Sequence, residues 1–149
     1  MQSRATMDAL LPFHDQPDTP HQAELGIIHL DPPQARLQQA RARLERQAAA
    51  DYLKSTGLRI FGQDWTCRAG TADLIAGNRR ILVVCRVKTR PAHARTGKLA
   101  RFQIRRLRRI GLAWLAMNGV LYEELRIDFI TLTRQDTGEF DIDHVPGVG

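Results

Sequence analysis

The sequence predicts one α/β domain in which helices flank a mixed central sheet. Helix-like and strand-like segments follow one another in the order α-β-β-β-α-β-β over residues 34–145. One strand candidate, Ile81–Cys85, is apolar on both faces, as expected for a strand covered on both sides of a sheet. The 149 residues, 43% of them hydrophobic, are enough for the core of one domain.

Two segments have the composition and the end signals of helices. The first helix is expected to begin just after Pro33 and to run to about Ser55, where Gly57 ends it. The second is expected over Lys98–Asn118, with Gly119 as its end. The predicted buried stripe of the first helix consists of residues at helical spacing: Leu37, Leu44, Ala48, Tyr52 and Leu53.

The remaining periodic segments are typical of strands. Between them, Gly77 and Asn78 predict a two-residue hairpin turn. Such a turn would place Asp73 opposite Leu82, four residues or about 13 Å along the strand from Arg86. The predicted strands are Leu58–Phe61, Trp65–Arg68, Ala72–Ala76, Arg80–Thr89, Arg126–Leu132 and Glu139–Val145.

The N-terminal region differs from the rest of the chain. Residues 1–33 hold five of the seven prolines and show little periodicity, which predicts a flexible tail before a domain at 34–149. Within the tail, the apolar stretch Leu25–Leu30 could dock on the core as an edge strand. No apolar run reaches the ~18 residues of a membrane span, and Met1–Leu11 lacks the apolar core of a secretory signal. We expect a cytoplasmic protein without membrane contact.

The cysteines and histidines do not form a metal motif. Cys67 and Cys85 lie 18 residues apart, and the five histidines are scattered, so no zinc pattern is present. Two small buried thiols in a reducing compartment are the expected arrangement.

Basic residues are concentrated after the tail. The first 33 residues contain one arginine and five acids, so the rest of the chain carries a net charge of +10, against +6 for the whole. This surplus favours a polyanionic partner, because each neutralised phosphate releases counterions. A solvated surface is the alternative explanation.

The second predicted helix has one face with charge of a single sign. Because no acid is interleaved, phosphate binding is favoured over a solvated face. No base-reading motif is present, so we expect the protein to bind nucleic acid through its phosphate backbone. DNA is the first expectation, and RNA is the alternative. A homodimer is also possible. The cationic face consists of Lys98, Arg101, Arg105, Arg108 and Arg109, opposite an apolar stripe of Ile104, Leu107, Ile110, Gly111 and Trp114.

The predicted hairpin carries residue types of a nuclease site. Asp73 on one strand, with Arg86 and Lys88 on the next, follows the spacing called PD-(D/E)XK. In such sites two carboxylates hold Mg²⁺, which activates water, and the lysine stabilises the charged phosphorus centre. These residues are common on strands, so Asp73 as a turn cap and Arg86 in solvent are the alternative.

Several separate motifs together resemble the YraN family, a bacterial group with a restriction-endonuclease-like fold. The resemblance covers roughly residues 40–149, and residues 144–149 are similar to actinobacterial members. It implies a restriction-endonuclease-like α/β fold and nuclease-like action on nucleic acid. The motifs are Ala49–Gly57, Asp64–Ala76, Leu82–Arg90, Arg106–Leu115 and Arg126–Ile130.

The resemblance also implies a degenerate site. The central aspartate and the lysine are kept as Asp73 and Lys88, but Arg86 stands where the family has its metal-binding glutamate. The helix glutamate of the family is replaced by Arg46, with Glu45 beside it. Other family positions also differ: Thr71 stands for a glutamate and Gln103 for a lysine, while Asp64 opens the central motif at the place of an asparagine.

These replacements change what the site could bind. Asp73 would be the only protein carboxylate left for a metal ion, so we expect neither a bound metal nor another cofactor. The Arg86 guanidinium is expected to pair with Asp73, and Lys88 and Arg90 to bind phosphate.

Three hypotheses follow, and the sequence leaves open whether the protein is an enzyme. The first is a nucleic-acid-binding protein with impaired or lost cleavage. The second is an active Mg²⁺- or Mn²⁺-dependent endonuclease that uses Asp73, Lys88 and Glu45 on branched or structured DNA. The third is a non-catalytic protein that pairs with an intact paralogue through its sheet edge or tail.

Overall fold

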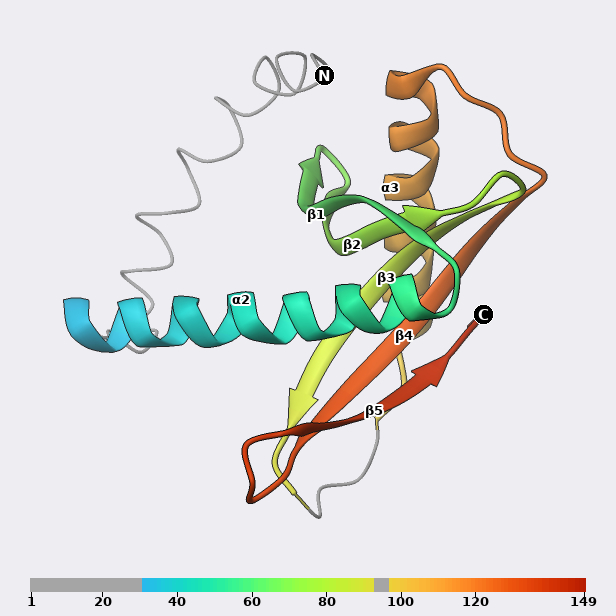
Figure 1. The fold of residues 1–149 in the computed structure, drawn as a ribbon. Helices are drawn as coiled ribbons and strands as arrows, with labels where there is room; N and C mark the ends of the chain where they lie inside the picture. Colours follow the sequence, from blue (N-terminus) through green and yellow to red (C-terminus); the bar gives the residue numbers. More distant parts are fainter. Residues whose placement is uncertain (1–30, 93–96) are drawn as a thin grey trace.

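The computed structural model describes residues 31–92 and 97–149, which form a five-stranded sheet with one helix on each face (Figure 1). This confirms the predicted α/β class and the order α-β-β-β-α-β-β, with five strands in place of the six strand segments predicted. The elements are α2 (Pro32–Ser55), β1 (Arg59–Cys67), β2 (Gly70–Gly77), β3 (Ile81–Arg90), α3 (Arg101–Asn118), β4 (Glu124–Arg134) and β5 (Phe140–Val145).

The sheet is mixed, with the strands in chain order from β1 to β5. Only β3 and β4 pair in parallel, and α3 forms the crossover between them. Successive residues of β3 point to opposite faces: Val83 and Cys85 pack in the core under α2, whereas Leu82 and Val84 pack in the core under α3. The strand predicted to be covered on both sides is therefore confirmed.

Helix α2 packs on the sheet with its second half only. It starts at the N-cap Asp31, whose side chain accepts a hydrogen bond from the Gln34 backbone N–H at 2.9 Å. The first half extends past the sheet (Figure 1), so the predicted burial of Leu37 and Leu44 is wrong. These two side chains are 55% and 66% exposed. The core contacts of α2 come from Ala48, Ala49, Ala50, Tyr52 and Leu53.

The two strands predicted at 58–61 and 65–68 are one strand, β1. A register shift between Ile60 and Gly62 bends the strand without ending its pairing with β2. Asp64 then adopts a positive φ of 51°, a conformation that aspartate tolerates better than most residues. The prediction placed a break between the two segments because the sequence does not show that the pairing with β2 continues through them.

The turn between β2 and β3 is longer than the predicted two residues. Gly77 pairs with Leu82, and residues 78–80 connect the two strands. The Asn78 side chain accepts hydrogen bonds from the backbone N–H groups of Arg80 and Ile81, at 2.8 and 2.9 Å. The Asn78 side chain thus stabilises a turn with more residues than the two-residue turn that Gly77 and Asn78 predicted.

This turn moves the register of the hairpin. Leu74 pairs with Cys85, so the next residue, Asp73, comes level with Arg86. The predicted separation of about 13 Å between Asp73 and Arg86 is therefore wrong. Register alone brings the two residues together.

Helix α3 begins later than predicted. Its first residue is Arg101, and the Gln103 side chain accepts a hydrogen bond from the Ala100 backbone N–H at 2.8 Å. Lys98 therefore lies in an exposed segment before the helix and not on the helical face. The predicted end is confirmed: Gly119 has a φ of 63°, which glycine adopts without strain.

The predicted tail lies mostly outside the described residues, and so does the possible edge strand Leu25–Leu30. Within the described part, no helix has the length and apolar character to cross a membrane. Both cysteines are free and buried, and burial raises the pKa of the Cys85 thiol well above its usual value. The prediction of two buried thiols is confirmed.

Candidate functional site

Asp73 lies where β2 and β3 separate. The strand pairing ends at Leu74 and Cys85, and beyond it the Asp73 Oδ2 accepts a hydrogen bond from the Val87 backbone N–H at 2.7 Å. The carboxylate thus replaces a strand carbonyl as the partner of β3. Burial raises the pKa of the Asp73 carboxyl above its ordinary value, while the Val87 hydrogen bond and the Arg86 charge oppose that shift.

Arg86 faces the same carboxylate across the hairpin. Its Nη1 lies 3.6 Å from the Asp73 Oδ2, and the side chains are 38% and 15% exposed. This distance is within ion-pair range but longer than a hydrogen bond, so the contact leaves the donors of the guanidinium free for other acceptors. Its Nε is buried and has no hydrogen-bond partner among the described residues.

A second aspartate–arginine pair lies near the first. The Arg46 Nε, from α2, contacts the Asp64 Oδ2 of β1 at 2.9 Å. Both residues are close enough to act on Asp73: the Asp64 charge raises the pKa of Asp73 and the Arg46 charge lowers it. The sequence analysis did not predict this pair, although the resemblance had singled out both residues.

The residues around Asp73 do not fit a divalent metal ion. A hard cation requires several anionic or neutral oxygen ligands, but the two nearby carboxylates, Asp73 and Asp64, each face a guanidinium. The Glu45 Oε2 accepts a hydrogen bond from the Arg134 Nη2 at 3.0 Å, so Glu45 is already paired on another part of the surface. Among the described residues, no three His, Cys, Asp or Glu side chains cluster as metal ligands.

A pocket of about 390 Å³ lies beside Arg86, on the α3 side of the sheet. Arg86 forms one wall of this pocket, and the first turns of α3 form the other with Phe102 and Arg106. The beginning of β2 closes it through Gly70 and Thr71. We refer to it as the Arg86 pocket.

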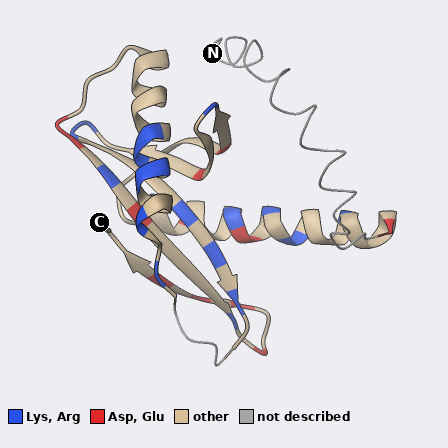
Figure 2. Ribbon diagram, turned by 180° about the vertical axis from the view of Figure 1, so that it is seen from behind, with Lys and Arg blue, Asp and Glu red and all other residues tan. Residues whose placement is uncertain are grey.

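Helix α3 carries the basic face that the sequence predicted, except for Lys98. The face is exposed and makes no ion pair with any acid in the described ranges. Figure 2 shows this run of basic residues along α3, and α3 packs on β3, which is also basic. The face consists of Arg101, Arg105, Arg108 and Arg109.

Lys88 and Arg90 follow Arg86 along β3 but differ in their surroundings. Lys88 is exposed and has no ion pair within the described ranges. Arg90 lines a separate pocket of about 560 Å³ between α2 and the ends of β3 and β4, together with Glu45 and Arg134. The structure therefore does not place Arg90 in the Arg86 pocket.

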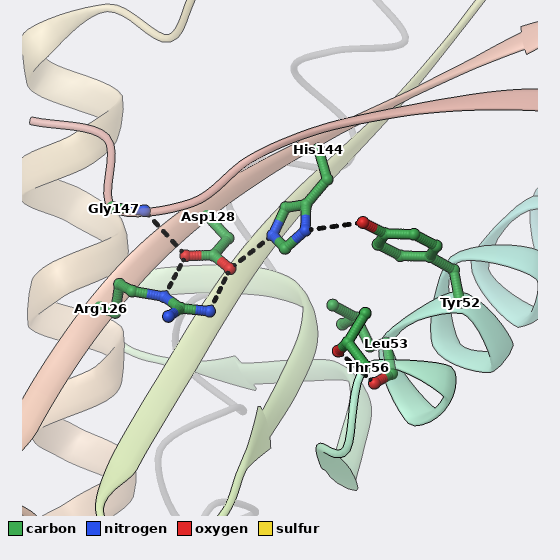
Figure 3. Close-up of polar contacts among 7 residues, drawn as sticks. All are labelled: Tyr52, Leu53, Thr56, Arg126, Asp128, His144 and Gly147. Atoms are coloured by element: carbon green, nitrogen blue, oxygen red, sulfur yellow. Dashed lines mark hydrogen bonds and ion pairs between the residues drawn. The ribbon is translucent and has the colours of Figure 1, made fainter.

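A buried polar network that the sequence analysis missed lies at β4 (Figure 3). Asp128 is fully buried, and the Nε and Nη2 of Arg126 donate to its two oxygens at 2.9 and 3.0 Å. The His144 Nε2 lies 2.7 Å from the same carboxylate, and the Gly147 backbone N–H donates to it at 3.0 Å. The His144 Nδ1 and the Tyr52 hydroxyl are 3.1 Å apart. The network joins α2, β4, β5 and the C-terminal residues.

Its chemistry is that of a structural link. The carboxylate of Asp128 has four donors around it and no exposed surface, so no substrate reaches it. The hydrogen bond to Asp128 raises the pKa of the Arg126 guanidinium, as expected for a charge-assisted pair. One signal was available in the sequence: an aspartate between the apolar residues Ile127 and Phe129 of a strand.

The mixed sheet with one helix on each face defines an α/β protein and is consistent with a restriction-endonuclease-like fold. The chain belongs to UPF0102, a family described as uncharacterised, whose model matches residues 45–132. This confirms the resemblance to the YraN-like family. The matched range includes Asp73, Arg86, Lys88 and the whole of α3.

Relatives with the name UPF0102 protein occur in actinobacteria. One from Nocardioides sp. is 34% identical over 119 residues, which cover 77% of this chain and 95% of the relative. Another, from Mycolicibacterium vanbaalenii, is 37% identical over 109 residues, 70% of this chain and 89% of the relative. A third, from Beutenbergia cavernae, is 34% identical over 106 residues, 69% and 90% of the two chains.

Proposed function

We propose that the protein binds nucleic acid, with DNA as the first expectation, through backbone phosphates and that it does not perform metal-dependent cleavage at Asp73. The observation that carries this proposal is the arginine face of α3. Four exposed arginines, Arg101, Arg105, Arg108 and Arg109, form this face without an acidic partner among the described residues.

Mutual repulsion makes such a face costly unless an anion approaches it. Phosphate groups meet this need because a guanidinium can donate two parallel hydrogen bonds to one phosphate. The net charge of +10 after residue 33 acts in the same direction by drawing a polyanion to the surface. Lys88 and Lys98, both exposed, would add to the same positive field.

The second half of the proposal rests on the two aspartate–arginine pairs. A divalent cation at Asp73 would lie next to the Arg86 guanidinium and would be repelled by it. A phosphate oxygen on the other side of Arg86, in the Arg86 pocket, would be attracted by Arg86 and Arg106. The site therefore supports recognition of a phosphate backbone better than metal-activated hydrolysis.

The test is a fluorescence-anisotropy titration of the full chain with labelled duplex, single-stranded and branched DNA at about 50 mM salt. We expect binding, and we expect the double variant Arg105→Gln, Arg109→Gln to bind more weakly and with a salt slope smaller by about 2. The matched control is Lys54→Gln, because Lys54 is an exposed cation of α2 that already lies 3.9 Å from Asp51.

Failure to bind any of the three DNA forms, or their RNA equivalents, at low salt would contradict the proposal. Co-purification with a paralogue in the absence of nucleic-acid affinity would instead support a protein-interaction role. Cleavage of circular DNA that needs Mn²⁺ and is lost in Asp73→Ala would support the endonuclease alternative.

A further inference from the structure

We propose that the Arg86 pocket takes one unstacked nucleotide, whose base stacks on Phe102 and whose phosphate lies between Arg86 and Arg106. The inference rests on the proposed function and narrows it: the ligand is nucleic acid with an unpaired segment. Three features of the pocket carry it, namely the shape of the wall formed by Arg106, the unused donors of Arg86 and the exposed ring of Phe102.

The shape of the pocket depends on Gly70. This residue has a φ of +135°, and a Cβ added there would lie 3.1 Å from the Arg106 Cδ. The stem of Arg106 therefore runs closely over the start of β2, where a larger residue would push it away. This contact places a second arginine on the wall of the pocket that holds Arg86.

Arg86 enters the pocket with donors to spare. Its Nε is buried without a hydrogen-bond partner in the described ranges, and its Nη1 is 3.6 Å from Asp73, beyond hydrogen-bond distance. The Arg86 side chain is 38% exposed, so its terminal nitrogens remain accessible although the Nε is buried. These nitrogens can donate to a phosphate oxygen in the pocket, which also neutralises part of the charge of Arg106.

Phe102 supplies an apolar surface next to these two cations. Its side chain is 56% exposed although it lines the pocket, and the Arg106 guanidinium carbon lies 6.0 Å from the ring centroid. An aromatic ring beside arginines is the arrangement that proteins use to stack a nucleobase and hold its phosphate. Inorganic phosphate alone would not cover the exposed part of this ring, whereas a nucleobase would.

A base inside a duplex cannot stack on the Phe102 ring, because both faces of the base are already stacked on its neighbours. Extruding it costs a few kcal/mol, whereas a base in a single strand or at a branch is available without that cost. We therefore infer that the pocket selects unpaired nucleotides, while the arginine face of α3 binds duplex and single strands alike.

The test uses the full chain and a short single-stranded DNA that carries one 2-aminopurine, whose fluorescence falls when it stacks. We expect wild type to quench it and Phe102→Leu to abolish the quenching. Phe102→Leu should weaken single-strand binding about five- to hundred-fold and leave duplex binding within about two-fold. Phe102→Tyr should restore both readings because it keeps the ring.

Leu112→Ala is the matched control, since Leu112 is an α3 side chain with nearly the same exposure, 55%, outside the pocket. It should bind like wild type. Unchanged quenching and affinity in Phe102→Leu, with wild type still binding DNA, would overturn this inference alone. Absence of all nucleic-acid binding by wild type would overturn the proposed function as well.

Discussion

The Arg86 guanidinium lies 3.6 Å from the Asp73 carboxylate, level with it across the β2–β3 hairpin. In the proposed function, this relationship disfavours a divalent cation and favours an anion. The negative charge of Asp73 is therefore met by a cation of the protein itself. What remains available at the surface is the unused hydrogen-bonding capacity of Arg86, which suits an anion.

Replacing Asp73 by asparagine should preserve or increase stability at neutral pH. Burial raises the folded-state pKa of Asp73 above the unfolded value of 3.8, so the folded protein binds this proton more tightly than the unfolded chain does. The stabilisation from the protonated carboxyl is complete below the unfolded pKa and is lost as pH rises through the folded one. Asp73→Asn keeps an acceptor for Val87 without the buried charge.

The stability difference between wild type and Asp73→Asn can be measured by thermal unfolding between about pH 3 and pH 7. This range includes the unfolded pKa of 3.8. The advantage of the variant should shrink toward the acid end. Asp73→Ala is the control, because it leaves the Val87 N–H without an acceptor and should cost about 1–3 kcal/mol. A clear loss of stability in Asp73→Asn at pH 7 would mean that the ion pair with Arg86 outweighs burial.

Replacing Arg86 by glutamate should create a site for a divalent metal ion beside Asp73. The change puts a second carboxylate level with Asp73 and removes the cation that repels a divalent ion. Mn²⁺ binding followed by electron paramagnetic resonance should become saturable in Arg86→Glu and stay weak in wild type. Arg86→Gln, which removes the cation without adding an acid, separates the two effects. Saturable binding by wild type that disappears in Asp73→Asn would contradict this prediction.

The network around Asp128 should be important for stability. Arg126→Gln leaves a fully buried carboxylate with weaker compensation, so we expect a loss of about 3–5 kcal/mol in the free energy of unfolding. Tyr52→Phe removes one hydrogen bond to His144 and should cost about 1 kcal/mol. Urea denaturation measures both. Equal, small losses would show that Asp128 is not held mainly by Arg126.

The two halves of α2 should respond differently to truncation of leucine. Leu53 is fully buried, so Leu53→Ala should cost about 2–5 kcal/mol. Leu44 is 66% exposed, and Leu44→Ala should change stability by less than about 0.5 kcal/mol. The same denaturation experiment checks this pair. A large loss in Leu44→Ala would mean that another part of the chain or a second copy covers the first half of the helix.

The elements that the sequence predicted well are those with a local signal. The apolar run Ile81–Cys85 identified the central strand, and the apolar stripe of α3 identified its buried face, because burial on a regular element follows its periodicity. Gly119 marked the end of α3 through its positive φ. The burial of Leu37 and Leu44 was predicted wrongly, because periodicity does not show where a helix passes the edge of its sheet.

The candidate site was predictable in its residue types and not in its geometry. The position of Arg86 in the motif indicated a pair with Asp73, but the Asn78 side chain sets the turn, and hence the register, through two hydrogen bonds. The pair of Arg46 and Asp64 joins residues from α2 and β1 across the fold. No spacing along the chain shows such a contact.

The salt dependence of DNA binding by wild type tests the central claim most directly. If the four arginines of the α3 face, Arg101, Arg105, Arg108 and Arg109, each neutralise one phosphate, the logarithm of the association constant should fall against the logarithm of salt concentration with a slope of about −3 to −4. Binding that is absent at about 50 mM salt, or that does not change with salt, would contradict the account.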